Sequence, residues 1–429
     1  MAKRVHFLGI GGSGASAAAA IALAQGYEVT GCDLEPHNEF TTQFRKSQLF
    51  KGHDPKHLSS HIGKGNVDIL AVTPAIFSID PKNSELREAR KRGIEVLTWQ
   101  RFLGEHLAKN KFVIAVCGTH GKTTTTAMIA KILEDAGLDP TVELGAIVPR
   151  WGTNYRVGKG KPALSGAEGY FVIEADEFND NFLHLKPDIT VVTNIEMDHP
   201  EYFKDFEAVK KSFAKFKSQS KKIFDKPNPR LIKFKLKVPG DFNVDNASLA
   251  FQVGLALGLD PGIIRRSLAN YQGVGRRFEY IGQYQGAKVS FPKENSPTVY
   301  SDFGHHPTEI KVTMQAAREK FPKNRILLIY QPHMFSRTKA LFDDFVKVFK
   351  NAPVDKIFIM DIYQSREKDL GLVTSKQLVK AVDKKSVYYI GSADQTLENL
   401  KPEIQNGDIL FFMSAGDTDK LARELVTAN

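Results

Sequence analysis

A glycine- and threonine-rich segment, residues 118–124, carries the side chains best suited to phosphate chemistry. It reads Gly-Thr-His-Gly-Lys-Thr-Thr and follows the apolar run Phe112–Cys117, although Val116 stands where a full phosphate loop has glycine. Backbone N–H groups of such a loop surround phosphate oxygens, the lysine offsets the charge of the outer phosphates, and a threonine hydroxyl holds Mg²⁺. The predicted nucleotide-binding residues are Gly118, Thr119, His120, Gly121, Lys122, Thr123 and Thr124.

A second glycine turn lies near the start of the chain, between an expected strand, Arg4–Leu8, and an expected helix, Ser13–Ala24. Asp33 follows a second expected strand, 19 residues past the last glycine of the turn. Glycines at this place let a diphosphate approach the N-terminus of a helix. The pattern indicates the diphosphate of a nucleotide, and a purely structural turn is the alternative. The turn contains Gly9, Gly11, Gly12, Ser13 and Gly14.

Acidic side chains follow two further apolar runs, at points where strands are expected to end. The first cluster is Glu174-Ala-Asp176-Glu177, and the second runs from Thr193 through Asn194, Glu196 and Asp198 to His199. Neighbouring carboxylates repel one another, so such clusters indicate a cation or a polar ligand. Sites in parallel sheets form at the carboxyl ends of strands, where both clusters lie. His199 would complete a Mg²⁺ shell or bind an anionic intermediate.

Two histidine-containing segments follow strong expected strands in the last third of the chain. One runs from Ser301 through Asp302 and His305 to Glu309, and the other is Gln331-Pro-His-Met-Phe-Ser-Arg-Thr. The adjacent histidines at 305 and 306 suggest zinc, but no Cys or His partners stand at metal-site spacing. A zinc site is therefore not favoured there.

The elements that must position these segments alternate between strand and helix along the whole chain. Such alternation predicts parallel sheets with crossover helices. We expect an α/β protein of three domains, residues 1–109, 110–275 and 276–429. The expected strands are Arg4–Leu8, Glu28–Cys32, Ile69–Thr73, Ile94–Leu97, Phe112–Cys117, Phe171–Glu174, Ile189–Asn194, Val299–Asp302, Ile326–Tyr330, Lys356–Met360, Val387–Ile390 and Asp408–Met413.

An amphipathic helix is expected where Phe203, Phe206, Val209, Phe213 and Phe216 recur at three- and four-residue steps, with lysines on the opposite face. Residues 204–237 hold 12 basic and three acidic side chains, which is nearly all of the chain's net charge of +10. We interpret this segment as a solvated basic face, with attraction of an anionic substrate as a secondary role. Nucleic-acid binding is less favoured, because no base-reading or stacking motif accompanies the charge.

Composition indicates a soluble globular protein. The chain has 429 residues, 42% of them hydrophobic and 25% charged. No signal peptide and no apolar run of about 18 residues is visible, so we expect a cytoplasmic protein without membrane insertion. Cys32 and Cys117 lie far apart at the ends of expected strands, which favours two small buried side chains in a reducing compartment over a disulfide framework.

The motifs together resemble those of the Mur ligase family, in the family's order and over essentially the whole chain. They comprise residues 118–124, Glu174–Glu177, Asn194–His199, Asn243–Asn246, Arg276–Phe278 and Asp302–Pro307. The first glycine turn and the stretches around His305 and His333 are similar to the members that join L-alanine to UDP-N-acetylmuramate in peptidoglycan synthesis. The resemblance implies ATP-dependent ligation through an acyl phosphate, with release of ADP and phosphate.

Three domain roles follow from the resemblance: a Rossmann-like UDP-binding domain, a central phosphate-loop ATPase domain that binds ATP and Mg²⁺, and a Rossmann-like C-terminal domain that brings in the amino acid and closes over the nucleotide. Residue roles follow as well. Lys122 would contact the transferred phosphate, and Thr123, Glu174 and His199 would hold Mg²⁺. The adenine-side helix would supply Asn243 and Asn246, and the third domain would supply Arg277 and Asp302 to ATP. L-Alanine would be placed by His305 and Arg337, and UDP by the first glycine turn, Asp33 and Thr73.

This chain differs from the L-alanine-adding members at two positions near the expected amino-acid pocket. It has Phe303 where those members usually have Tyr, and Met334 where they usually have Arg. These differences leave the identity of the added amino acid open. A close alternative is the recycling ligase that attaches an intact tripeptide to the same sugar nucleotide and shares the first four motifs. The stretch Gln331-Pro-His333 and Arg337 favours a single amino acid. More distant alternatives are an NAD-linked oxidoreductase built on the first glycine turn, which leaves residues 118–124 unexplained, and a nucleic-acid-binding ATPase that uses residues 204–237. The sequence leaves the oligomeric state open.

Overall fold

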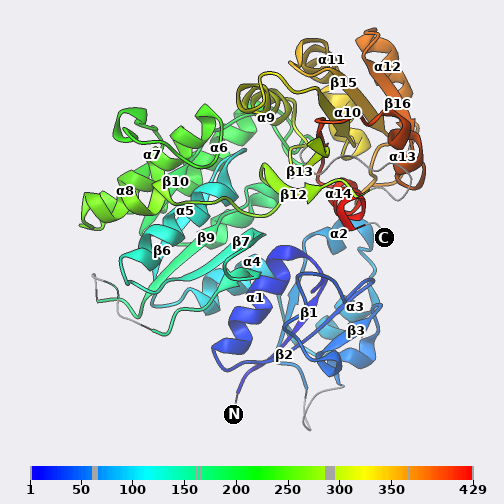
Figure 1. Cartoon of the computed structure of the whole chain (residues 1–429). Coiled ribbons are helices and arrows are strands. Elements are labelled where there is room, and N and C mark those ends of the chain that lie inside the picture. The colour runs from blue at the N-terminus through cyan, green and yellow to red at the C-terminus, as the bar shows by residue number, and fades with distance from the viewer. Residues whose placement is uncertain are drawn as a thin grey trace. The chain divides into compact units, whose positions relative to one another are not determined.

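The computed structural model describes residues 2–59, 66–160, 163, 166–285, 295–365 and 367–427. In this part of the chain, strands and helices alternate to form three sheets, as the sequence predicts (Figure 1). The chain divides into two compact units. The first comprises Met1–Met197, Asp205–Lys235 and Asp245–Val274, and the second comprises Asp198–Lys204, Leu236–Val244 and Gly275–Asn429. The domain boundaries at 109/110 and 275/276 stay predictions.

The first sheet is parallel throughout, in the order β3-β2-β1-β4-β5. Its central strand is largely buried because neighbouring strands pair with both of its edges and both of its faces are covered. Its strands are β1 (Arg4–Leu8), β2 (Glu28–Asp33), β3 (Leu49–Lys51), β4 (Ile69–Val72) and β5 (Glu95–Thr98). The accompanying helices are α1 (Ser13–Ala24), η1 (Lys46–Gln48), η2 (Pro55–Leu58), α2 (Ala75–Ile79), α3 (Ser84–Lys91), α4 (Trp99–Phe102) and η3 (Leu103–Leu107).

The second sheet has the order β11-β10-β6-β9-β7-β8 and is parallel except for the β7–β8 pair. The central strand β6 leads directly through residues 118–121 into α5, so the phosphate segment lies at the carboxyl edge of the sheet (Figure 1). The strands are β6 (Phe112–Cys117), β7 (Thr141–Val148), β8 (Thr153–Arg156), β9 (Tyr170–Glu174), β10 (Ile189–Val192) and β11 (Lys222–Phe224). The helices of residues 122–269 are α5 (Lys122–Asp135), η4 (Phe178–His184), α6 (Phe206–Ser218), η5 (Pro229–Leu231), α7 (Asp241–Ala256) and α8 (Pro261–Ala269).

The third sheet, in the second unit, has the order β12-β13-β17-β14-β15-β16, and its edge strand β12 is antiparallel to β13. Its strands are β12 (Glu279–Gln283), β13 (Thr298–Asp302), β14 (Ile326–Tyr330), β15 (Lys356–Met360), β16 (Val387–Gly391) and β17 (Ile409–Met413). Its helices are α9 (Pro307–Lys320), α10 (Phe335–Ala340), α11 (Phe342–Asn351), α12 (Ser375–Val382), α13 (Ala393–Leu400), η7 (Lys401–Glu403) and α14 (Thr418–Thr427). None of the helices in the described ranges combines the length and apolarity that crossing a bilayer requires.

Every strand expected from the sequence is present, within two residues at either end. Strands β3, β7, β8, β11 and β12 were not predicted. Four of them, β3, β8, β11 and β12, are sheet edges, where one side faces no partner and a continuous apolar run is not needed. Both cysteines are confirmed as buried, free thiols at strand ends, in β2 and β6.

The phenylalanine-rich helix is shorter than its apolar pattern suggests. Helix α6 begins at Phe206 after the N-cap Asp205, so Phe203 lies outside it. Phe206 was expected on the buried face, but it is 39% exposed and lies under the Lys210 ammonium at 4.5 Å. The N-cap fixes where the helix starts, and the first turn therefore projects into solvent. The buried face is carried by Val209, Phe213 and Phe216, and the phenylalanine rings pack on Phe182 of η4.

We predict that Phe216→Ala will lower the free energy of unfolding by about 3–5 kcal/mol, because a fully buried ring stacked 4.4 Å from Phe182 would leave a cavity. The matched control, Phe206→Ala, removes an exposed ring of the same helix and should cost less than about 1 kcal/mol. Urea unfolding of the three proteins measures both values. Equal losses from the two substitutions would contradict the burial described here.

Candidate functional site

The Lys122 ammonium is the centre of the phosphate segment. Its Nζ atom donates to the carbonyl of Gly118 at 2.6 Å and lies 3.0 and 2.9 Å from the two carboxylate oxygens of Glu177. Burial opposes the charged form of Lys122, but the neighbouring carboxylates, Glu177 foremost, outweigh burial and hold its pKa above the usual value. A cation is thereby fixed at the N-terminus of α5, where the helix itself favours anions.

Thr123 and Glu174 form an oxygen-rich pair beside this cation. The Thr123 hydroxyl donates to Glu174 Oε1 at 3.0 Å, and the second carboxylate oxygen accepts the Gly145 N–H at 2.8 Å. Thr123 follows directly on the loop and Glu174 ends β9, so adjacent strands β6 and β9 bring the two together. Hydroxyl and carboxylate oxygens are the ligands that Mg²⁺ prefers. The donor set is therefore suited to Mg²⁺.

The loop backbone is held from β10 by two side chains that follow that strand. Asn194 accepts the His120 N–H through Oδ1 at 2.9 Å and donates from Nδ2 to the His120 carbonyl at 3.0 Å, while the Thr193 hydroxyl donates to the same carbonyl at 2.5 Å. Gly121, the N-cap of α5, has φ +82°, and a Cβ there would lie 2.6 Å from Asn246 Oδ1. Only glycine is comfortable in that conformation and space.

The first glycine turn is assembled as the sequence predicts, between β1 and α1. Gly9 has φ +92°, and a Cβ there would meet the Thr73 side chain at 2.3 Å, so these two candidates lie in contact. Asp33 accepts the Gly11 N–H at 2.9 Å. Its carboxylate therefore braces the turn itself. Asn38 also holds the turn by donating to the Gly11 carbonyl at 2.9 Å, a contact that the sequence did not suggest.

Asp302 ends β13 in the second unit and organises the chain around it. Its two oxygens accept the N–H groups of Phe278 and Gly304, each at 2.8 Å. Burial raises the pKa of Asp302 to about 6, although Arg277 opposes the shift. The Arg277 guanidinium lies 3.6 Å from Glu309 and 5.0 Å from the Phe303 ring centre. Asp302 and Arg277, both predicted to contact ATP, thus lie in one cluster of the second unit.

Arg337, on α10, is almost fully buried and points to Asp198. Its Nε donates to Asp198 Oδ1 at 3.0 Å, and its Nη1 lies 3.2 Å from His333 Nδ1. His305 joins this group, with its ring centre 5.7 Å from that of His333. Asp198 belonged to an acidic cluster in the sequence without an assigned role. It is the residue that balances the Arg337 charge.

Two residues that differ from the expected pattern lie beside this group. Met334 is fully buried and serves as the N-cap of α10 with φ +72°, an uncommon conformation for a residue with a side chain. Its N–H donates to the Tyr363 carbonyl and its own carbonyl accepts the Thr338 hydroxyl, each at 2.8 Å. Phe303 receives the guanidinium of Arg276 over its ring, at 4.8 Å.

His199 and Asn243 also belong to the second unit, whereas the phosphate segment belongs to the first. His199 has φ +54°, and its Nδ1 lies 3.2 Å from Glu201. Asn243 donates from Nδ2 to the Pro239 carbonyl at 2.7 Å. Their roles toward Mg²⁺ and adenine stay predictions.

Glu143 is a buried acid that the sequence did not single out. It lies on β7, and burial together with the charges of Glu174 and Asp176 raises its pKa well above the usual range. The surroundings of Glu143 therefore disfavour its charged form, beside the predicted metal ligand Glu174. A single carboxylate within a strand gives no sequence signal, because it is usually interpreted as a side chain that faces solvent.

Three family models match the chain in succession. The Mur ligase family catalytic domain matches residues 4–111, the Mur ligase middle domain residues 116–224, and the Mur ligase glutamate ligase domain residues 276–416. The chain belongs to the Mur ligase family. No oxidoreductase or nucleic-acid-binding domain is among these three, so the two distant alternatives gain no support from them.

Relatives of this Mur ligase match over almost its full length. A UDP-N-acetylmuramate–L-alanine ligase from Aquifex aeolicus is 34% identical, with 99% of this chain and 97% of the relative covered. The crystal structure of the UDP-N-acetylmuramate–alanine ligase MurC from Thermotoga maritima is 26% identical with a TM-score of 0.76, covering 99% and 98% of the two chains. A murein peptide ligase from Psychrobacter arcticus has the same fold, with 23% identity, a TM-score of 0.67 and coverage of 99% and 98%.

We predict that His305 makes the stability of this Mur ligase depend on pH. Burial and Arg337 lower the pKa of His305 to about 4, below the model-peptide value of about 6.5. Between these two pH values His305 binds a proton in the unfolded chain but not in the folded protein. The free energy of unfolding therefore falls as the pH falls. Linkage gives a loss of about 2 kcal/mol between pH 7 and pH 5.

His305→Gln should abolish that part of the loss, while His37→Gln, at an exposed histidine, should leave it unchanged. Urea unfolding at the two pH values measures the difference for each protein. A wild-type loss that persists undiminished in His305→Gln would show that His305 is not the group responsible.

Proposed function

We propose that this Mur ligase joins L-alanine to the carboxylate of UDP-N-acetylmuramate, with consumption of ATP, in peptidoglycan synthesis. The observation that carries the proposal is the Lys122 ammonium, fixed by Glu177 and Gly118 at the start of α5 inside a Mur ligase middle domain. The 34% identity to a ligase of this activity over 99% of the chain supports the choice of substrates.

In the proposed reaction, the muramate carboxylate attacks the γ-phosphate of ATP and displaces ADP. Lys122 offsets the charge that develops on the transferred phosphoryl group, and the loop N–H groups orient the phosphates. The amine of L-alanine then attacks the acyl phosphate, and the tetrahedral intermediate releases phosphate. Because Lys122 is already held in place by Glu177 at 2.9 Å, no large side-chain movement is needed to present its charge.

Mg²⁺ would be held by Thr123 and Glu174, with His199 as the further ligand suggested by the family resemblance. When bound, it would withdraw charge from the phosphate oxygens. The pair lies 3.0 Å apart and both members are oxygen donors, which suits a hard cation. Gly145 N–H holds the second oxygen of Glu174, so the carboxylate is oriented before any ion binds.

The amino acid would be placed in the second unit by His305 and Arg337. The Nε atom of Arg337 donates to Asp198 at 3.0 Å, and Nη1 lies toward His333. Arg337 would therefore share its N–H donors between Asp198 and the carboxylate of the amino acid. UDP would bind at the first glycine turn with Thr73. The tripeptide-recycling reaction is the alternative, because Phe303 and Met334 alter the same group. A cytoplasmic location stays a prediction.

The first test removes the ammonium. Lys122→Ala should lower phosphate release from ATP by at least about 10²-fold, because a preorganised donor to the transition-state charge is lost. Lys210→Ala, at an exposed lysine of α6, should leave the rate unchanged. A Lys122→Ala enzyme with wild-type turnover would contradict the proposed role of this residue.

The second test varies the acceptor. ADP release is measured with ATP, UDP-N-acetylmuramate and one acceptor at a time: L-alanine, glycine, L-serine or the tripeptide. L-Alanine should give the highest kcat/KM, since each methyl group or added hydroxyl changes binding by about 1–3 kcal/mol in a shaped pocket. A preference for the tripeptide would support the recycling ligase instead.

A further inference from the structure

A buried cluster in the first unit takes no part in the proposed reaction. It combines two imidazoles, a thiol and a carboxylate from two strands and two helices of this unit. Its members are His6 of β1, Cys32 of β2, His57 of η2 and Glu85 of α3. Their four potential ligand atoms all lie within 4.8 Å of one another. This group was not predicted from the sequence, because its members are spread over 80 residues without metal-site spacing.

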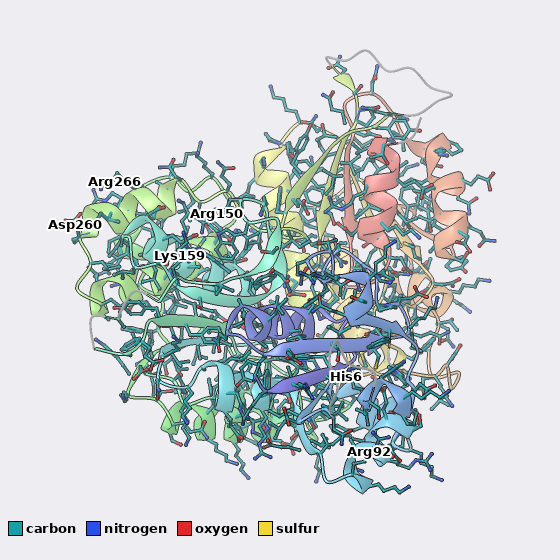
Figure 2. All side chains as sticks on the ribbon, turned by 90° about the horizontal axis from the view of Figure 1, so that it is seen from below. His6, Arg92, Arg150, Lys159, Asp260 and Arg266 are labelled. Atoms are coloured by element: carbon teal, nitrogen blue, oxygen red, sulfur yellow. The ribbon has the colours of Figure 1, made fainter. Side chains whose placement is uncertain are left out.

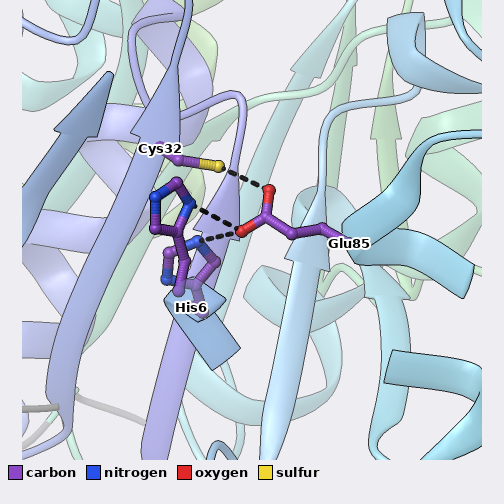
Figure 3. A group of neighbouring side chains, drawn as sticks. His6, Cys32 and Glu85 are labelled. Carbon is purple, nitrogen blue, oxygen red and sulfur yellow. Dashed lines mark hydrogen bonds and ion pairs between the residues drawn. The ribbon is translucent and has the colours of Figure 1, made fainter. Parts of the chain in front are cut away.

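The Glu85 carboxylate is the meeting point of the cluster. The Cys32 thiol donates to Glu85 Oε2 at 3.0 Å, and the Nδ1 atom of His57 lies 3.0 Å from Oε1. His6 Nε2 lies 3.3 Å from the same Oε1. Figure 3 shows the Cys32 sulfur and the His6 ring turned toward the Glu85 carboxylate.

The cluster lies inside the domain. The side chains of His6 and Glu85 are 0% exposed, Cys32 is likewise fully buried, and that of His57 is 13% exposed. His6 lies among the strands of the first sheet, in contrast to Arg92 at the surface (Figure 2). In the residues that the structure describes, no lysine or arginine pairs with Glu85, so histidines are the only basic groups beside this buried charge.

The His6 ring is oriented as a metal-binding histidine would be. Its Nε2 atom is buried and, although near Glu85, forms no hydrogen bond of acceptable geometry with any described residue. Its other nitrogen, Nδ1, is bonded to the buried Thr30 hydroxyl at 2.8 Å. A metal-bound histidine has this arrangement: one nitrogen anchored by an outer partner and the other aimed at the ion.

We propose that His6, Cys32, His57 and Glu85 form a structural zinc site. Two imidazole nitrogens, one thiolate and one carboxylate oxygen are the donor types that Zn²⁺ takes in a four-coordinate site. The bond lengths usual for zinc place tetrahedral ligands roughly 3.3–3.7 Å apart, so side-chain adjustments of up to about 1 Å close the cluster on an ion. With four protein ligands, the site leaves no position for a substrate and is structural.

Zinc binding would change two existing contacts. The Cys32 thiol would lose its proton to solvent and its hydrogen bond to Glu85, and the sulfur would bind the metal. His57 Nδ1 would give up a long hydrogen bond, 3.3 Å, from the Asp54 N–H. His53 Nδ1, 3.3 Å from the Cys32 sulfur, would remain as an outer neighbour of the thiolate.

The site would stabilise the first glycine turn through Cys32. The Cys32 carbonyl accepts the N–H groups of Gly9 and Ile10, at 2.8 and 3.1 Å, while its side chain faces the cluster. An ion held by β1, β2, η2 and α3 would thus tie the two strands of the turn to the elements behind them. This role is independent of the ligase reaction.

The test uses the full chain, loaded with zinc and dialysed, with metal content measured by mass spectrometry. We expect about one zinc per chain, lost in Glu85→Gln and His57→Gln and retained in His106→Gln, at a histidine of the same domain outside the cluster. Thr30→Val should weaken zinc affinity by about 10–100-fold, because the outer partner of His6 is removed. Absence of bound zinc in the wild-type chain would overturn the proposal, as would undiminished binding in Glu85→Gln.

Cobalt provides a second readout, which reports directly on the sulfur ligand. Co²⁺ added to the wild-type chain should give thiolate-to-cobalt absorption, which Cys117→Ala retains and Cys32→Ser lacks. Circular dichroism checks that each variant is folded. Should Cys32→Ser fail to fold, protection of the Cys32 thiol from alkylation by added zinc in a Cys117→Ala background replaces it. A cobalt spectrum without a thiolate band, or a thiol that zinc does not protect, would exclude the site.

Discussion

The phosphate segment depends on one requirement. The charge of a largely buried ammonium must be balanced by a carboxylate while the ammonium stays at the phosphate loop. Lys122 meets it by pairing with Glu177 and with the Gly118 carbonyl of its own loop. A buried cation that lost its carboxylate would cost several kcal/mol. The carboxylates at the end of β9 and directly after it are therefore needed to keep Lys122 charged. Repulsion among them is relieved by the same ammonium and by backbone N–H donors.

The position of this pair follows from strand order. β6 lies between β9 and β10, so the loop after β6 meets the acidic residues after β9 on one side and Asn194 after β10 on the other. Three segments from separate parts of residues 118–194 thus converge at one sheet edge. The second unit repeats the principle around Asp302 after β13, whose carboxylate accepts two backbone N–H groups and so shapes the chain around it.

The sequence was sufficient for the parallel strands and for the residues at their ends, because buried strands are continuous apolar runs and sites lie after them. It was insufficient for edge strands such as β3 and β12 and for the exposed start of α6 at Phe206. It also missed pairings between distant residues, among them Arg337 with Asp198 and the cluster around Glu85. Such pairings depend on three-dimensional packing, and no local pattern in one chain encodes them.

The burial of Cys117 at the end of β6 has a consequence for handling the protein. Burial raises the pKa of this thiol far above the usual range, and only a thiolate reacts readily with oxidants or maleimides. The sulfur next to the nucleotide loop is thereby shielded from peroxide damage as long as the central sheet stays closed. The rate at which this thiol reacts with a maleimide therefore reports how often that sheet opens.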